Sequence, residues 1–156
     1  MIRLRCAHLG LILTAALSSL TKAQDEATPV SIDPKRLIGT WEVMAAEERG
    51  QRIEEMMLLD QALIFEADGS YRVLVGQTAI ESGQFTVDAA SNLGWIDLRI
   101  TRGKDAGKVQ RGLFRFEGNR LLLTFYRPGV ESRPKDFETR PETEQFTFWL
   151  RRRLPK

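Results

Sequence analysis

Cysteine and histidine, on which much enzyme and metal chemistry depends, are almost absent from this sequence. Among 156 residues there is one cysteine, Cys6, and one histidine, His8. Both lie in an N-terminal segment that we expect to be removed. Without them the chain has no disulfide, no zinc site built from histidine and cysteine, and no Ser-His-Asp or Cys-His catalytic group.

Residues 1–23 are typical of a secretory signal peptide, with a basic start and an apolar stretch over residues 9–20. This stretch is too short for a membrane-spanning helix, which needs about 20 apolar residues. Thr21 and Ala23 are small residues at the positions that a signal peptidase reads, so we expect cleavage between Ala23 and Gln24. The sequence therefore predicts an exported protein, periplasmic or extracellular.

Removal of this segment changes the charge. The segment holds three of the 23 basic residues and none of the 21 acidic ones, which leaves 20 basic against 21 acidic residues and a formal charge of −1. The full chain has a formal charge of +2. A weakly acidic chain has no basic excess that would attract nucleic acid or anionic lipid. We therefore predict no nucleic-acid partner and no membrane span after cleavage.

The motifs of other sites are also missing. Adjacent carboxylates such as Glu47 and Glu48 point to opposite faces of a strand, which does not suit the facing pair of a glycosidase. The acidic pairs lack the ligand spacing of a calcium loop. The stretch GKDAGK at 103–108 fails the spacing of a phosphate-binding loop, and no helix signal follows it. We therefore predict no catalytic residue, no metal ligand and no cofactor.

Strand signals and turn signals alternate along the rest of the chain, without a long helix between them. A short helical turn is expected at 33–37 and a short helix or covering loop at 48–59. Eight strands joined mostly by short turns close most economically into an up-and-down antiparallel barrel; a β-sandwich is the alternative. The predicted strands cover residues 38–47, 60–67, 70–76, 79–88, 94–101, 109–116, 120–127 and 145–152.

We therefore expect three parts: a signal peptide at 1–23, an N-terminal segment at 24–36, and one all-β barrel domain at 37–153. The 133 residues from 24 to 156 are an ordinary size for a single domain.

Alternation within the strands predicts which side chains fill the barrel. An eight-stranded barrel has room for packed side chains or for one small ligand. Each aromatic side chain buries about 150–250 Å², so several of them favour a filled interior. A narrow pocket near one mouth is the alternative. The aromatic residues expected to point inward are Trp41, Phe65, Tyr71, Phe85, Phe114, Phe125 and Phe148.

Three local patterns give sharper expectations. Asp68-Gly69 favours a tight two-residue turn between its flanking strands. Gly83, inside a strand, indicates a bulge or a point of close packing. In the first strand, alternation places Trp41, Val43 and Ala45 on one face.

Short motifs recur in a fixed order from about Leu37 to Arg152. In that order and spacing the chain resembles a family of lipocalin-like exported domains of uncharacterised function, abundant in Planctomycetes. The family often has a cysteine where this chain has Thr124. The motifs are Leu37-x-Gly39-Thr40-Trp41, Gly83-x-Phe85-Thr86-x-Asp88, Ile96-Asp97-Leu98, Gly107-Lys108, Gly112-x-Phe114, Gly118-x-x-Leu121-x-Leu123 and Arg133-Pro134-x-x-Phe137.

The resemblance implies a role for the first tryptophan. In lipocalin-like barrels it packs at the closed end against a basic side chain of the last strand. Alternation places Arg152 on the same face as Phe148, so Arg152 is expected to lie on the Trp41 ring, a contact worth about 0.5–2 kcal/mol. Arg151 would take this place if the register were shifted by one residue. Gly39, Trp41 and Arg152 are thus expected to close the barrel rather than to contact a ligand.

The long connection before the last strand contains Arg133, Pro134 and Phe137. Phe137 needs an apolar site in which to bury. The segment is expected to form a lid that is pinned across one end of the barrel by Phe137 and an ion pair of Arg133. The alternative is a gate over the mouth of a ligand site.

The resemblance implies a non-enzymatic function, the binding of a small apolar ligand inside an exported barrel. The alternative is a cell-envelope interaction module or an inhibitor, with a packed barrel and no internal ligand. A deep apolar cavity would favour the first, and a packed interior with an exposed apolar patch would favour the second.

Overall fold

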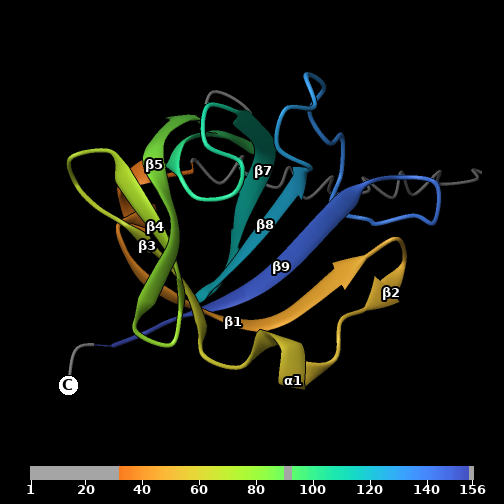
Figure 1. Cartoon of the computed structure of the whole chain (residues 1–156), viewed down its shortest axis with the longest axis horizontal. Coiled ribbons are helices and arrows are strands. Elements are labelled where there is room, and N and C mark those ends of the chain that lie inside the picture. The colour runs from red at the N-terminus through yellow and green to blue at the C-terminus, as the bar shows by residue number, and fades with distance from the viewer. Residues whose placement is uncertain (1–31, 90–92, 155–156) are drawn as a thin grey trace, which may run out of the picture.

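The computed structural model describes residues 32–89 and 93–154. The predicted signal peptide and residues 24–31 lie outside the described residues. Within the described part, nine antiparallel strands form one sheet that closes on itself (Figure 1). The elements are a 3-10 helix (Pro34–Leu37), β1 (Gly39–Glu48), β2 (Gln51–Arg52), α1 (Glu55–Leu58), β3 (Gln61–Phe65), β4 (Ser70–Val75), β5 (Thr78–Asp88), β6 (Gly94–Arg102), β7 (Val109–Glu117), β8 (Arg120–Tyr126) and β9 (Gln145–Arg152).

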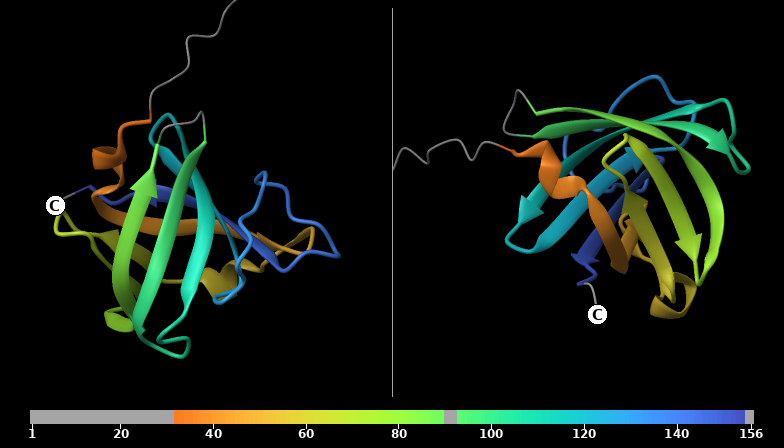
Figure 2. Two further views of the ribbon diagram at one scale, coloured as in Figure 1. Left: turned by 90° about the horizontal axis from the view of Figure 1, so that it is seen from above. Right: turned by 90° about the vertical axis from the view of Figure 1, so that its left-hand side faces the viewer.

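The sheet is a closed eight-stranded barrel with one short extra strand. From β3 to β9 each strand pairs with the next, and β1 pairs with both β3 and β9. The extra strand, β2, pairs only with the end of β1. Because β1 and β9 are joined, the prediction of an up-and-down barrel is confirmed and the two-sheet alternative is wrong. Figure 2 shows the strands curving around a common interior, with the connection between β8 and β9 outside the wall.

A β-bulge changes the inner face of β1. Val43 pairs with Leu150 and Ala45 pairs with Trp149, so β1 carries one extra residue at this point. Beyond the bulge Ala46, and not Ala45, faces the core. The prediction that Ala45 shares a face with Trp41 and Val43 is therefore wrong, because a bulge shifts the alternation by one residue.

The gap between β1 and β3 is filled by the segment from 49 to 60. The last pair between these strands is Glu42 with Ala62, and beyond it β1 pairs with β9 and, at its end, with β2. The backbone N–H of Ile53 donates to the carbonyl of Ala46 at 2.9 Å, and Leu58 of α1 is buried in the core. The short helix predicted in this region thus helps to complete the wall of the barrel (Figure 1).

Gly83 lies at a point of close packing, as predicted. A Cβ atom on it would lie 2.0 Å from the carbonyl oxygen of Arg99 and 2.9 Å from a ring carbon of Tyr71. The register between β5 and β6 also shifts beside it, between Ser82 and Gly83. No residue larger than glycine fits here without moving β6.

The turn between β3 and β4 is one residue longer than predicted. The Glu66 N–H donates to the Ser70 carbonyl at 2.9 Å, and the Gly69 N–H donates to the Glu66 carbonyl at 3.1 Å. This leaves three residues in the loop, with Gly69 at φ 82°. A turn of this kind ends in a left-handed glycine, which keeps the twist of the two strands matched.

The predicted residues Gly39, Trp41 and Arg152 come together at one end of the barrel. The guanidinium carbon of Arg152 lies 4.4 Å from the centre of the Trp41 ring, and Arg152 Nη1 donates to the Ile38 carbonyl at 2.7 Å. Gly39 has φ 132°, and a Cβ atom on it would lie 2.5 Å from Arg152 Nη1. Arg151 points outward and pairs with Glu42 at 3.0 Å.

The aromatic side chains fill this closed end. Trp41 is only 2% exposed, and its indole N–H donates to the Leu37 carbonyl at 2.7 Å. All seven aromatic residues predicted to point inward belong to the core or pack against it. The interior is therefore filled at this end, as the aromatic content predicts.

Replacing Arg152 with alanine is expected to lower the free energy of unfolding by about 2–4 kcal/mol, because it removes the contact with Trp41 and a charged donor to the half-buried Ile38 carbonyl. Arg151→Ala is the matched control, since its exposed pair with Glu42 is worth less than about 1 kcal/mol. Urea unfolding followed by tryptophan fluorescence measures both variants. If both variants lost the same free energy of unfolding, the result would contradict a special role of Arg152 in closing the barrel.

Candidate ligand pocket at the open end of the barrel

A cavity of about 580 Å³ occupies the end of the barrel away from Trp41. Ligand sites for small molecules have volumes of about 300–1,000 Å³, so this one is large enough for a small ligand. At this end the barrel has a pocket near one mouth, which was the alternative to a fully packed interior. Its apolar wall comes from six strands and consists of Val43, Leu63, Val73, Leu98, Phe125, Phe146 and Phe148.

The cavity exists because inward side chains differ in size between the two ends. Val43, Leu63 and Val73 are aliphatic residues that face the open end from β1, β3 and β4. On β3 and β4 the next inward positions toward the closed end are Phe65 and Tyr71, which pair with each other and are fully buried. Along β3 and β4, rings therefore fill the closed end and smaller aliphatic side chains leave space at the open end, whose remaining wall includes phenylalanines of β8 and β9.

A polar group lies among these apolar walls. Glu81 of β5 lines the cavity, and the Tyr71 hydroxyl donates to its Oε1 at 2.9 Å. Burial raises the pKa of the Glu81 carboxyl, and the nearby Asp105 carboxylate raises it further, while the hydrogen bond from Tyr71 opposes the shift. Burial together with the charge of Glu81 raises the pKa of the Tyr71 hydroxyl well above its ordinary value. Tyr71 therefore remains a hydrogen-bond donor to Glu81.

Charged side chains surround the mouth, and most of them are paired. Lys108 lies 2.7 Å from Asp105, and this contact lowers the pKa of the Asp105 carboxyl. Arg127 lies 3.2 Å from Glu48. Lys104 also lines the cavity, from the loop between β6 and β7. The mouth thus carries both signs of charge in near balance.

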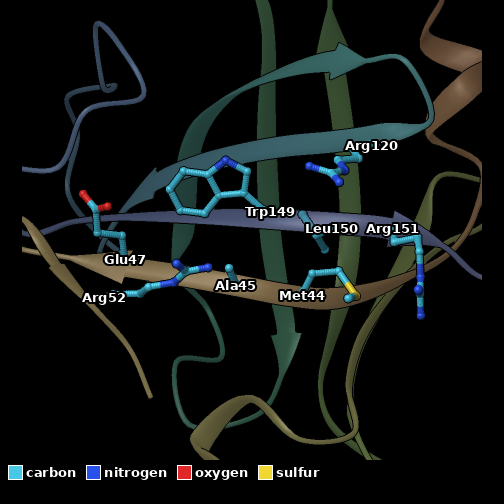
Figure 3. A pocket seen from close by; sticks show the side chains of 8 residues that line it. All are labelled: Met44, Ala45, Glu47, Arg52, Arg120, Trp149, Leu150 and Arg151. Atoms are coloured by element: carbon cyan, nitrogen blue, oxygen red, sulfur yellow. The ribbon is translucent and has the colours of Figure 1, made fainter. Parts of the chain in front are cut away.

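A second hollow, of about 560 Å³, lies on the outside of the wall (Figure 3). The bulge in β1 exposes Met44 beside it, and Trp149 of β9 stands between Arg120 of β8 and Arg52 of β2. The lining of this hollow comes from four strands and carries the charged side chains of Glu47, Arg52, Arg120 and Arg151. The candidate ligand site is the cavity in the barrel interior, where apolar side chains converge from six strands.

The predicted residues of the long connection lie on the outer wall of the barrel. Arg133 donates from Nη1 to the carbonyls of Ile96 and Gly112, at 3.0 and 2.6 Å, and pairs with Asp97 at 2.5 Å. Its guanidinium carbon also lies 4.9 Å from the centre of the Trp95 ring. Arg133 therefore ties the connection to β6 and β7.

The rest of the connection covers β8 and β9 from outside. Pro134 is buried, and the Phe137 carbonyl accepts a hydrogen bond from Thr147 at 2.9 Å. The Thr147 hydroxyl also lies 2.9 Å from the Thr124 hydroxyl, so the threonine at the family's cysteine position is part of a buried polar layer. Arg133, Pro134 and Phe137 do not line the cavity. These three residues cover the wall and do not cross the mouth.

Glu81 was not among the residues predicted for the site, although it lines the cavity. One signal for it is present: Gly83, Phe85 and Val87 mark the inward positions of this strand, and Glu81 continues the same alternation. A carboxylate in that position is unusual, because charged groups are rarely buried without a partner. The polar residues of the loop at 103–108 give no comparable signal, because a loop has no regular alternation.

Among residues 32–89 and 93–154, no group of three or more acidic, histidine or cysteine side chains is placed to hold a metal ion. The helices in that part of the chain are also too short and too polar to cross a membrane.

Comparison of the chain with models of protein families, with curated proteins and with solved structures finds no match. The term lipocalin-like therefore describes the fold here, a closed eight-stranded antiparallel barrel.

Arg133→Ala is expected to lower the free energy of unfolding by about 2–4 kcal/mol, because two carbonyls and Asp97 lose a charged donor. Arg115→Ala is the control, since Arg115 lies over the Phe137 ring but makes only an exposed pair with Glu117. Chemical unfolding of both variants measures the difference. If the segment only covers the wall, folded Arg133→Ala protein binds an apolar fluorescent probe as the parent does. Faster entry of the probe would instead indicate a gate.

Proposed function

We propose that this protein is an exported, non-enzymatic lipocalin-like protein that binds a small apolar or amphipathic molecule in the open end of its barrel. The observation that carries the proposal is the cavity of about 580 Å³, which is lined by apolar side chains from six strands. Burial of apolar surface contributes about 25 cal/mol per Å², so such a wall favours a hydrocarbon or ring system.

The geometry of the two ends supports the same proposal. The closed end is filled by aromatic rings, and Arg152 covers Trp41. Ligand entry is therefore restricted to the opposite end. There the paired charges of Lys108 with Asp105 and of Arg127 with Glu48 leave a polar rim around an apolar interior. This arrangement suits a ligand that keeps one polar end near water.

Export and the absence of catalysis are part of the proposal. The pattern of residues 1–23 supports export to the periplasm or beyond, as does the resemblance to the exported domains of the Planctomycetes type. The lone cysteine and histidine lie within this segment. Catalysis by the remaining chain would need carboxylate, tyrosine or lysine chemistry.

A second candidate is an interaction module or inhibitor of the cell envelope that works through its outer face. The outer hollow supports it, because Trp149 and Met44 offer apolar surface between Arg120 and Arg52 (Figure 3). Tryptophan, methionine and arginine are the residues enriched at protein interfaces. In this case the barrel interior would need no ligand.

Native mass spectrometry of the protein, purified without denaturant, distinguishes the two candidates. The expected result is a reproducible added mass that disappears after denaturation, and that mass identifies the chemical class of the ligand. A bare protein mass that stays unchanged when lipid extracts are added would contradict ligand binding and favour the outer-face candidate.

Val73→Trp is expected to abolish binding of an apolar fluorescent probe, because the indole would occupy the cavity from β4. Arg72→Trp is the matched control, since the neighbouring residue is exposed and points outward from the same strand. Fluorescence titration with N-phenyl-1-naphthylamine measures both variants, and circular dichroism checks that each is folded. Equal probe binding by the two folded variants would place the binding site outside the barrel.

A further inference from the structure

Glu81 is the one carboxylate that the described strands project into the cavity. It pairs with Val73 across β4 and β5, and both side chains line the cavity wall. Gly83 and Phe85 follow Glu81 at every second position of β5, so all three lie on the inward face of this strand. A one-residue change in register would have put this carboxylate in water. Its position is therefore a property of the pocket and not of the exposed surface.

The charge of Glu81 is only partly balanced by the protein. Oε1 accepts the hydrogen bond from Tyr71, whereas Oε2 has no donor in the described part of the chain. No lysine or arginine among the described residues forms an ion pair with Glu81. Partial burial raises the pKa of its carboxyl, because it disfavours the charged form. Glu81 is half-buried and lines the cavity, so a cation on a ligand that enters the cavity can pair with its carboxylate.

We propose that the ligand of this cavity is an apolar amine, whose protonated nitrogen donates to Glu81 while its hydrocarbon part packs against Leu98, Phe125 and Phe148. This inference rests on the proposed function of the cavity as a ligand site. It narrows the ligand from any small apolar molecule to one that carries a cationic nitrogen. A hydrogen bond between an ammonium group and a carboxylate is stronger than one between neutral groups.

Tyr71 positions the carboxylate for this contact. Its side chain is fully buried, and its hydroxyl donates to Oε1, which leaves Oε2 for the ligand. The raised pKa of the hydroxyl keeps it protonated, so it holds Glu81 without adding charge to the site. Tyr71 is thus a positioning residue, and Glu81 makes the contact.

The lysine and arginine side chains at the mouth attract an anionic ligand less strongly than Glu81 attracts a cationic one. Lys108 and Arg127 already pair with Asp105 and Glu48. Lys104 makes no ion pair with the described residues, but it is exposed, so water and salt screen its charge. The charge with the least screening is that of Glu81, and it has the sign that attracts a cation.

Three probes with the same chain and different head groups test the inference: decylamine, 1-decanol and decanoate. Each competes with N-phenyl-1-naphthylamine for the full-length protein, at a slightly alkaline pH where the amine is protonated and Glu81 is ionised. Decylamine is expected to bind about tenfold or more tightly than decanol, and decanoate most weakly. The measurement is repeated on Glu81→Gln, which keeps the size of the side chain and an acceptor for Tyr71.

Glu81→Gln is expected to bind decylamine and decanol about equally. Glu66→Gln changes a half-exposed carboxylate outside the cavity and keeps the preference of the parent. A preference for decanoate, or equal binding of all three probes by the parent, would overturn the amine inference while leaving the pocket as a ligand site. An amine preference that survives Glu81→Gln would also overturn it. Failure of N-phenyl-1-naphthylamine to bind the parent protein would instead count against the proposed function itself.

Discussion

Besides the short β2 at its end, β1 pairs with two longer strands, β3 over residues 39–42 and β9 over residues 41–48. The rest of the structure depends on this double pairing. The bulge between Val43 and Ala45 lets the strand change direction, so that its second half leaves β3 and follows β9. The segment that contains β2 and α1 fills the resulting gap. Closure of the sheet and the shape of its open end therefore have one common cause.

The two ends of the barrel differ in how tightly their side chains pack. At the closed end, aromatic packing and the contact of Arg152 with Trp41 provide stability. At the open end, smaller side chains make fewer contacts across the interior and leave a cavity. The long connection adds stability from outside, through Arg133 and a buried polar layer, without entering the interior. A substitution in the cavity wall can therefore change the shape of the cavity while the closed end and the outer wall still stabilise the fold.

Much of the fold follows from local sequence pattern, because alternation and turn residues act over a few positions. The eight strands, the inward aromatic side chains and the packing of Gly83 were predictable in this way. The position of Ala45 was not, because a bulge depends on how β1 fits two partners that are distant in sequence. The candidate site was harder to predict from the sequence than the position of Ala45. Whether the interior is packed or hollow depends on the sum of side-chain volumes from six strands, and no single strand reveals it.

The closure has a consequence for the order in which the chain folds. Arg152 donates to the Ile38 carbonyl across 114 positions of sequence, and the whole ladder between β1 and β9 spans a similar distance. Contacts between such distant segments form slowly, because a large loop must first be ordered. Until β9 has been synthesised and docks, one edge of β1 stays open to pairing with other chains. We therefore expect the pairing of β9 with β1 to be the rate-limiting step of folding. The barrel in which these two strands have not yet paired is then the species most exposed to aggregation.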